Sequence, residues 1–157
     1  MSERPVYLTS AGHEQLQQEL HQLKTVRRQQ IAERLHYALA EGELIENAEL
    51  EDARREQSFV ETRVYQLEQQ LRLAVIIEND GATTDVVSLG YHVTVQEEGS
   101  STPEKYYMVG SAEASPKEGR ISNESPLGQA LLGKRVGEQA VVRAPDGDIV
   151  FHILAVQ

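Results

Sequence analysis

Two long stretches of regularly spaced apolar residues, separated by a short acidic segment, constrain the fold of this chain more than any other feature. The first stretch contains Leu16, Leu20 and Leu23 and then, after a slip in the spacing, Ile31, Leu35 and Ala38. The second contains Val60, Val64, Leu67, Leu71 and Ala74, whose steps of four and three are typical of a coiled coil. Residues 10–76 contain no proline. The spacing therefore predicts two helices of roughly 30 residues, each about 45 Å long.

The ends of both predicted helices carry capping signals. Thr9 can accept a backbone N–H at the start of the first helix, and Gly42 can take the left-handed conformation that ends it. Asn47 can cap the second helix, whose dipole is favoured by the acids that follow. Because the gap between the helices is short, we expect an antiparallel coiled-coil hairpin with the acidic segment at its tip.

The pattern after residue 76 is typical of β-structure. Residues 91–96 and 105–109 alternate between apolar and polar side chains, and residues 140–154 predict a β-hairpin around an Asp-Gly step. A short helix is expected from Pro126 to Gly133, capped by Ser125. The predicted fold class is α+β, with a coiled-coil hairpin over residues 1–77 and a small β-rich domain over residues 78–157.

Composition narrows the classes of function. The 157 residues include no cysteine, which excludes disulfides and thiolate metal sites. The net charge of −10 argues against binding duplex nucleic acid through general electrostatics and favours basic protein surfaces as partners. The sequence has neither a membrane-length apolar run nor a signal-peptide pattern, so we expect no membrane association and a cytoplasmic location.

The acidic segment, residues 41–52, holds six acids and no Lys or Arg. Glu43 and Glu46 lie three residues apart, and paired carboxylates can hold a hard cation such as Mg²⁺ or position a water. Two carboxylates are an incomplete site, because Mg²⁺ takes about six oxygen ligands. A second molecule would have to supply the rest. The alternative, which the pattern alone favours, is that the acids form the solvated surface of an exposed turn.

Arg54 and Arg55 are the basic residues nearest to this segment. They could contact the phosphates of a nucleic acid. The alternative is that they form exposed ion pairs along the coiled coil, worth about 0–1 kcal/mol each. The sequence contains no P-loop, nucleophile elbow or dinucleotide fingerprint, and its second domain has few aromatic residues. We therefore expect the second domain to be a docking module.

Three segments, taken in order, resemble the bacterial Gre transcript-cleavage factors. Residues 9–12 with the leucines that follow are similar to the opening of that family. Residues 42–50, Gly-Glu-Leu-Ile-Glu-Asn-Ala-Glu-Leu, resemble its tip motif G-D-x-x-E-N-A-E-Y, and residues 121–134 resemble its C-terminal signature. The resemblance covers nearly the whole chain, and it implies that the second domain has an FKBP-like fold.

The resemblance also implies a function and a partner. The chain would be a monomeric transcription elongation factor, and not an enzyme by itself. Its second domain would dock on the β′ coiled coil of RNA polymerase, at the rim of the secondary channel, through Ser122, Ser125 and Pro126. The hairpin would then enter the channel and rescue arrested complexes by stimulating cleavage of backtracked RNA.

Within the channel, the resemblance assigns roles to the tip residues. Glu43 and Glu46 would help to hold the second catalytic Mg²⁺, which the polymerase itself mainly binds, beside the 3′ end of the RNA. Asn47 and Arg54 match motif positions expected near that RNA, and Arg55 is expected there because it is the other basic residue nearest to the acidic segment.

Two positions depart from the family motif. Glu43 replaces the usual Asp and is one methylene longer, which moves the carboxylate by roughly an ångström or more. A displacement of that size can cost about a hundredfold in rate. Leu50 replaces the usual Tyr. An inhibitor that occupies the same channel without stimulating cleavage is therefore the first alternative. A peptidyl-prolyl isomerase or chaperone and a structural coiled-coil adaptor are alternatives of other classes.

Overall fold

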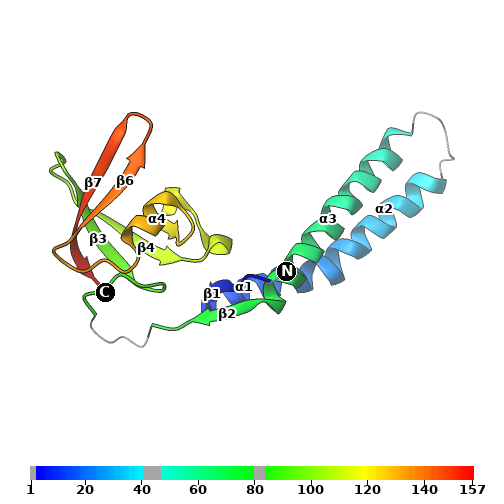
Figure 1. Ribbon diagram of the computed structural model, residues 1–157. Coiled ribbons are helices and arrows are strands. Elements are labelled where there is room, and N and C mark those ends of the chain that lie inside the picture. The colour runs from blue at the N-terminus through cyan, green and yellow to red at the C-terminus, as the bar shows by residue number, and fades with distance from the viewer. Residues whose placement is uncertain (1–2, 41–46, 80–83) are drawn as a thin grey trace. The chain divides into compact units, whose positions relative to one another are not determined.

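The computed structural model describes residues 3–40, 47–79 and 84–157 (Figure 1). Contacts divide these residues into two compact units, one of them formed by His13–Leu73 and the other by the residues up to Gly12 together with Ala74–Gln157. The first unit is helical and the second is built mainly from strands. The predicted α+β fold class is confirmed. No helix among the described residues is long and apolar enough to cross a membrane.

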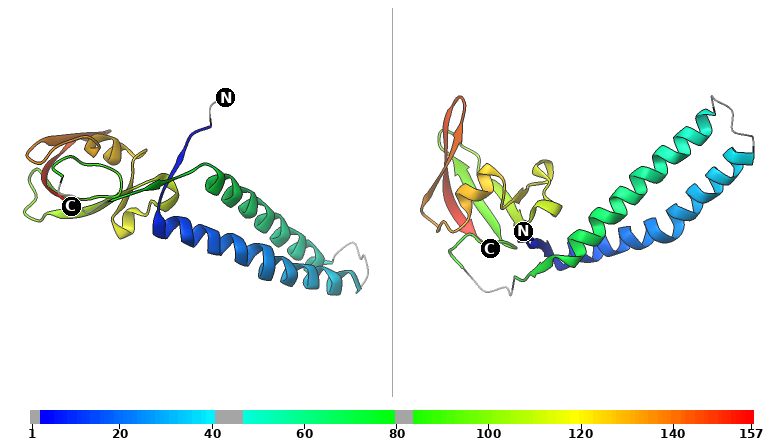
Figure 2. Two further views of the ribbon diagram at one scale, coloured as in Figure 1. Left: turned by 90° about the horizontal axis from the view of Figure 1, so that it is seen from below. Right: turned by 45° about the vertical axis from the view of Figure 1, so that its right-hand side comes forward.

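The helical unit is an antiparallel hairpin. Its first arm runs through α1 (Ser10–Gln22), a π-helical turn η1 (Leu23–Arg27) and α2 (Arg28–Ala40), and its second arm is α3 (Ala48–Arg72). All views in Figures 1 and 2 place α2 and α3 side by side. Ion pairs confirm the antiparallel direction, because Lys24 pairs with Glu68 near one end and Arg34 pairs with Glu49 near the other.

The predicted apolar stripes meet in one seam between the two arms. Ile31, Val60 and Val64 are its buried centre, against which Leu20, Leu23 and Leu35 pack half-buried. Burying a side chain of this size stabilises the fold by about 1.5–3 kcal/mol. The charged residues beside the seam pair across it, so that both arms are held by apolar contact inside and by ion pairs at the edges.

The slip in the first apolar stripe coincides with the π-helical turn η1. Leu23 and Ile31 are eight residues apart, one more than a heptad. The π turn takes up this extra residue through a bond from the N–H of Arg28 to the carbonyl oxygen of Leu23, five residues earlier. The Thr25 hydroxyl also donates to the carbonyl oxygen of His21, at 2.7 Å. As a result, the residues before and after the turn face the same partner helix.

The second unit contains a five-stranded sheet. Its strand order is β5-β4-β3-β7-β6, in which β4 and β5 are parallel and the other neighbours are antiparallel. The strands are β3 (His92–Glu97), β4 (Glu104–Val109), β5 (Arg120–Ser122), β6 (Gln139–Ala144) and β7 (Gly147–Val156). The core of this unit lies between the sheet and α4 (Pro126–Leu131), and its buried centre includes Val93, Val95, Met108, Leu131 and Ile153. The predicted β-hairpin corresponds to β6 and β7.

A second, two-stranded parallel sheet, formed by β1 (Val6–Thr9) and β2 (Ala74–Ile77), flanks the hairpin in sequence. Its contacts group it with the five-stranded sheet, whereas the sequence assigned residues 1–77 to the hairpin. Thr9 caps α1 as predicted, because its hydroxyl oxygen accepts from the N–H of Gly12 at 3.0 Å. Thr9 also donates through its N–H and its hydroxyl to the carboxylate of Glu113, in the 3₁₀ turn η2 (Ser111–Glu113), at 2.7 and 2.6 Å. A Cβ at Gly12 would lie 2.3 Å from this carboxylate, so a larger residue there would displace the Glu113 side chain.

The π turn gives a direct test of how the seam is kept in phase. Deleting Val26, an exposed residue of η1, brings Leu23 and Ile31 to a heptad spacing, so a regular helix can carry the same stripe. We expect the hairpin to keep its stability. Deleting the exposed Glu33 instead rotates the residues after it by about 100° and removes Leu35 and Ala38 from the seam. That deletion is expected to cost about 2–4 kcal/mol.

Thermal unfolding followed by far-UV circular dichroism compares the two deletions. An equal loss of stability in both variants would show that the π turn is needed for more than the phase of the stripe.

Candidate functional site

The predicted site lies in the acidic segment that joins the two arms. Its central residues, Glu43 and Glu46, lie outside the described residues, as does Gly42. The structure describes the residues on both sides of residues 41–46, which we call the tip segment. α2 extends to Ala40 before it, and Asn47 follows it.

Asn47 bonds to both arms of the hairpin. Its side-chain oxygen accepts from the N–H of Leu50 at 3.0 Å, which makes it the N-cap of α3, as predicted. Its side-chain amide donates to the carbonyl oxygen of Ala38 at 3.0 Å, in the last turn of α2. An asparagine cap alone is worth about 1 kcal/mol. The second bond means that Asn47 holds the two ends of the tip segment close together.

A small apolar layer lies directly beneath this polar bridge. Ala38, Leu50 and Ala53 are buried, with exposures of 1%, 7% and 0%. Leu50 stands where the family motif has tyrosine, and its side chain is buried. The departure from the motif therefore falls on a buried position of α3.

Arg34 of α2 contacts three carboxylates of α3. Its Nη2 lies 2.8 Å from Glu49 Oε1 and 3.0 Å from Asp52 Oδ2, and its Nη1 pairs with Glu56. Hydrogen bonds to Glu49 and then to Asp52 raise the pKa of Arg34 above its ordinary value, so the guanidinium stays charged. Arg27 pairs with Glu56 as well. We call Arg34 with its three carboxylate partners the arginine clamp.

The clamp changes the electrostatic interpretation of the acidic segment. The sequence treated residues 41–52 as one uncompensated negative stretch. In the structure, Glu49 and Asp52 share one guanidinium, so part of the negative charge that belongs to α3 is compensated, while Glu51 is exposed. The sequence analysis does not single out Arg34, because nothing local to it indicates partners on the other arm.

Arg54 and Arg55, the predicted RNA-proximal pair, lie on the exposed surface of α3. The Arg55 side chain is 67% exposed, and its guanidinium is 3.8 Å from Asp52. Arg54 is exposed and forms no ion pair with any other residue in the described ranges. Both cations are thus accessible to a partner, whereas the arginines of α2 are engaged across the seam.

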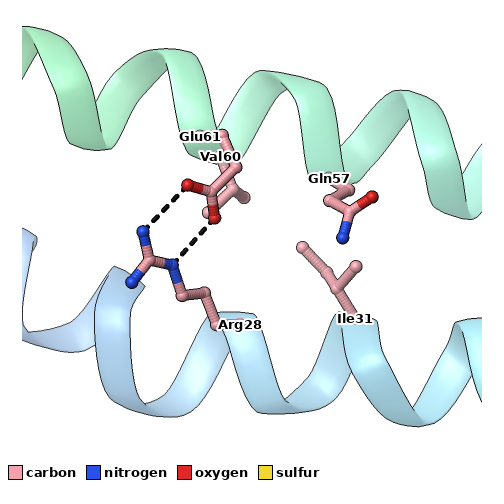
Figure 3. A pocket seen from close by; sticks show the side chains of 5 residues that line it. All are labelled: Arg28, Ile31, Gln57, Val60 and Glu61. Atoms are coloured by element: carbon pink, nitrogen blue, oxygen red, sulfur yellow. Dashed lines mark hydrogen bonds and ion pairs between the residues drawn. The ribbon is translucent and has the colours of Figure 1, made fainter.

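Arg28 shows the ordinary form of such a cross-seam pair. It binds Glu61 through two hydrogen bonds of 2.8 Å, and both residues line a small pocket together with Ile31, Gln57 and Val60 (Figure 3). The hydrogen bond from Arg28 lowers the pKa of Glu61. Arg28 thus binds a single carboxylate, whereas Arg34 binds three.

The predicted docking residues belong to a loop, residues 122–126, between β5 and α4. Ser122 is 8% exposed, and its hydroxyl oxygen accepts from the N–H of Glu124 at 2.9 Å. Ser125 donates to the carbonyl oxygen of Ser122 at 2.7 Å and accepts from the N–H of Gly128 at 3.0 Å, which confirms it as the cap of α4. Both serines therefore shape the loop from inside.

Pro126 and Glu124 are the exposed residues of this loop. Pro126 occupies the first position of α4, where its missing N–H costs no hydrogen bond. A partner that approaches the loop would meet these two side chains first. Among the residues the structure describes, no group of three or more His, Cys, Asp or Glu side chains could hold a metal.

Comparisons with known families cover both units. The family model described as "Transcription elongation factor, N-terminal" matches residues 6–76, and "Transcription elongation factor, GreA/GreB, C-term" matches residues 82–157. The chain belongs to the GreA/GreB family of transcription elongation factors.

Relatives named transcription elongation factor GreA match over their whole length. The proteins of Bacillus cytotoxicus and Geobacillus kaustophilus are each 47% identical over 156 residues, which is 99% of both chains. That of Oceanobacillus iheyensis is 48% identical over 155 residues, covering 99% of this chain and 98% of its own. Among solved structures, GreA factor homolog 1 of Thermus thermophilus is 33% identical, with 98% and 99% coverage and a TM-score of 0.45.

The two hydrogen bonds of Asn47 can be tested separately by substitution. Asn47→Asp keeps the side-chain acceptor that caps α3 but loses the donor to Ala38, whereas Asn47→Ala loses both bonds. We expect Asn47→Ala to destabilise the hairpin by about 1–2 kcal/mol. Asn47→Asp is expected to keep the helix start but to loosen the end of α2. Hydrogen exchange of the amides in both arms separates the two effects, and identical exchange in both variants would contradict a bridging role.

Gly128 controls the shape of the loop at residues 122–126. A Cβ at this position would lie 1.8 Å from the carbonyl oxygen of Ser122, which is backbone and cannot move freely. Gly128→Ala is therefore expected to displace the loop and to cost about 1–3 kcal/mol. Gln129→Ala, an exposed change in the same helix, is expected to stay within about 0.5 kcal/mol. Thermal unfolding compares the stabilities of the two variants. Equal stability would contradict the close approach of Gly128 to the carbonyl oxygen of Ser122.

Proposed function

We propose that this protein binds RNA polymerase at its secondary channel and stimulates the cleavage of backtracked RNA by the polymerase. Family membership over both units supports the proposal. The observation that carries it is the bridge at Asn47. The described part of the family's tip motif, residues 47–50, directly follows the tip segment, and Asn47 bonds to the last turn of α2.

In this proposal, Glu43 and Glu46 supply oxygen ligands that another protein completes. Carboxylates suit a hard cation, but two of them fill only part of the coordination sphere of about six oxygens that Mg²⁺ takes. The polymerase would provide the remaining ligands, and the bound Mg²⁺ would lower the pKa of a water and neutralise charge that develops on the phosphate. The chain is then a cofactor protein for the polymerase and not a nuclease by itself.

The two exposed arginines complete the proposed tip. Arg54 and Arg55 would hold the phosphates of the displaced RNA 3′ end beside the carboxylates. Their positive charge is available because the carboxylates of α3 that face α2 pair with Arg27, Arg28 and Arg34.

The second unit would supply binding to the polymerase. Pro126 and Glu124 are the exposed parts of the docking loop, and the proposed partner is the β′ coiled coil at the channel rim. Ser122 and Ser125 would contribute by fixing the loop, since their hydroxyls are engaged in internal hydrogen bonds.

A second candidate function is inhibition of the polymerase from the same channel. Glu43, one methylene longer than the family's usual aspartate, favours this alternative. A carboxylate displaced by about an ångström could occupy the site without supporting cleavage.

A cleavage assay on a backtracked polymerase complex separates the two functions. We expect Mg²⁺-dependent shortening of the RNA, and at least about a hundredfold loss for Glu43→Ala or Glu46→Ala. Glu33→Ala removes an exposed acid elsewhere on the hairpin and serves as the control that keeps activity. Glu43→Asp tests the extra methylene directly. Binding to the polymerase without any shortening at saturating protein would reject cleavage stimulation in favour of inhibition.

A further inference from the structure

We propose that Arg34 is a positioning residue for the tip. It fixes the first turns of α3 against α2, and it keeps Glu49 and Asp52 engaged, so that these two carboxylates do not compete for a cation. This inference rests on the proposed function for its effect on cleavage, while its structural part concerns this chain alone.

The geometry requires a guanidinium. Nε and Nη2 both approach Glu49 Oε1, at 3.1 and 2.8 Å, while Nη2 also reaches Asp52 and Nη1 reaches Glu56. Three carboxylates from two successive turns of α3 thus accept hydrogen bonds from one planar guanidinium, whose N–H groups point in different directions. A lysine ammonium is a point charge on a flexible stem and cannot reproduce this fork.

The position of the clamp links it to the tip. Arg34 lies less than two turns before Ala40, the last residue of α2, and its partner Glu49 lies in the first turn of α3. The bridge at Asn47 and the buried pair Leu50 and Ala53 lie in the same turns of α3. Polar bridge, apolar layer and arginine clamp therefore all act on the two ends of the tip segment.

Removing Arg34 would leave an unfavourable arrangement of charge. Glu49, Asp52 and Glu56 are spaced three and four residues apart, so their carboxylates are neighbours on one face of α3 and repel one another. Arg27 would still pair with Glu56, but the remaining contact of Asp52, with Arg55, is 3.8 Å long. The start of α3 would open more often, and the freed carboxylates would compete for a divalent cation.

Arg28 provides a matched control. Arg28 and Arg34 are both arginines of α2 that pair across the seam, and both lose one positive charge when replaced by glutamine. Arg28 serves only Glu61, further from the tip. An effect specific to the clamp must appear in Arg34→Gln and be absent from Arg28→Gln.

The first measurement is amide hydrogen exchange in the free, full-length protein. The N–H groups of Leu50 and Glu51 bond to Asn47 and report on opening of the first turn of α3. Arg34→Gln is expected to speed their exchange by about tenfold or more, Arg34→Lys by less, and Arg28→Gln not at all. Equal exchange in Arg34→Gln and Arg28→Gln would overturn the positioning role.

The second measurement is cleavage by a backtracked polymerase complex as a function of protein concentration. Arg34→Gln is expected to lower the maximal rate about tenfold or more with an unchanged half-saturating concentration, and Arg34→Lys is expected to restore part of it. A change in the half-saturating concentration alone would assign Arg34 to polymerase binding and overturn the proposal. If the wild type itself fails to stimulate cleavage, the proposed function fails, and hydrogen exchange still decides for or against the clamp.

Discussion

The apolar seam between the two arms of the hairpin is the constraint on which the helical unit depends. Its buried centre consists of Ile31, Val60 and Val64. Because the hairpin has only two helices, the apolar residues of each arm can pack only against the other arm. Every residue of the stripe must therefore face the opposite arm. The π turn at Leu23–Arg27 meets this requirement by taking up one extra residue without breaking the helix. The alignment of the two arms that results also decides which charged residues can form ion pairs across the seam.

Towards the tip, polar contacts join the apolar ones. Ala38, Leu50 and Ala53 are buried there, and Asn47 and the arginine clamp add bonds between the two arms. These contacts also decide where charge remains. Glu49, Asp52, Glu56 and Glu61 of α3 pair with arginines of α2, while Arg54 and Arg55 are exposed.

The loop at residues 122–126, the predicted docking loop, also divides into inner and outer residues. Ser122 and Ser125 use their hydroxyls within the loop, and Gly128 lets the first turn of α4 approach the carbonyl of Ser122. This leaves Glu124 and Pro126 on the surface. A family signature of this kind therefore combines residues that shape a surface with residues that a partner can reach, and burial tells them apart.

The sequence by itself determined the two helices, the β-hairpin of β6 and β7, and the caps at Thr9, Asn47 and Ser125. All of these depend on periodicity or on hydrogen bonds between residues three or four apart, which a linear pattern contains. Only the tertiary structure decided the pairing of β1 with β2, the bonds from Thr9 to Glu113, the bridge from Asn47 to Ala38 and the three partners of Arg34. Each of these joins residues from different elements, and a side chain's own neighbours in sequence do not specify which distant carbonyl or carboxylate the fold will bring to it.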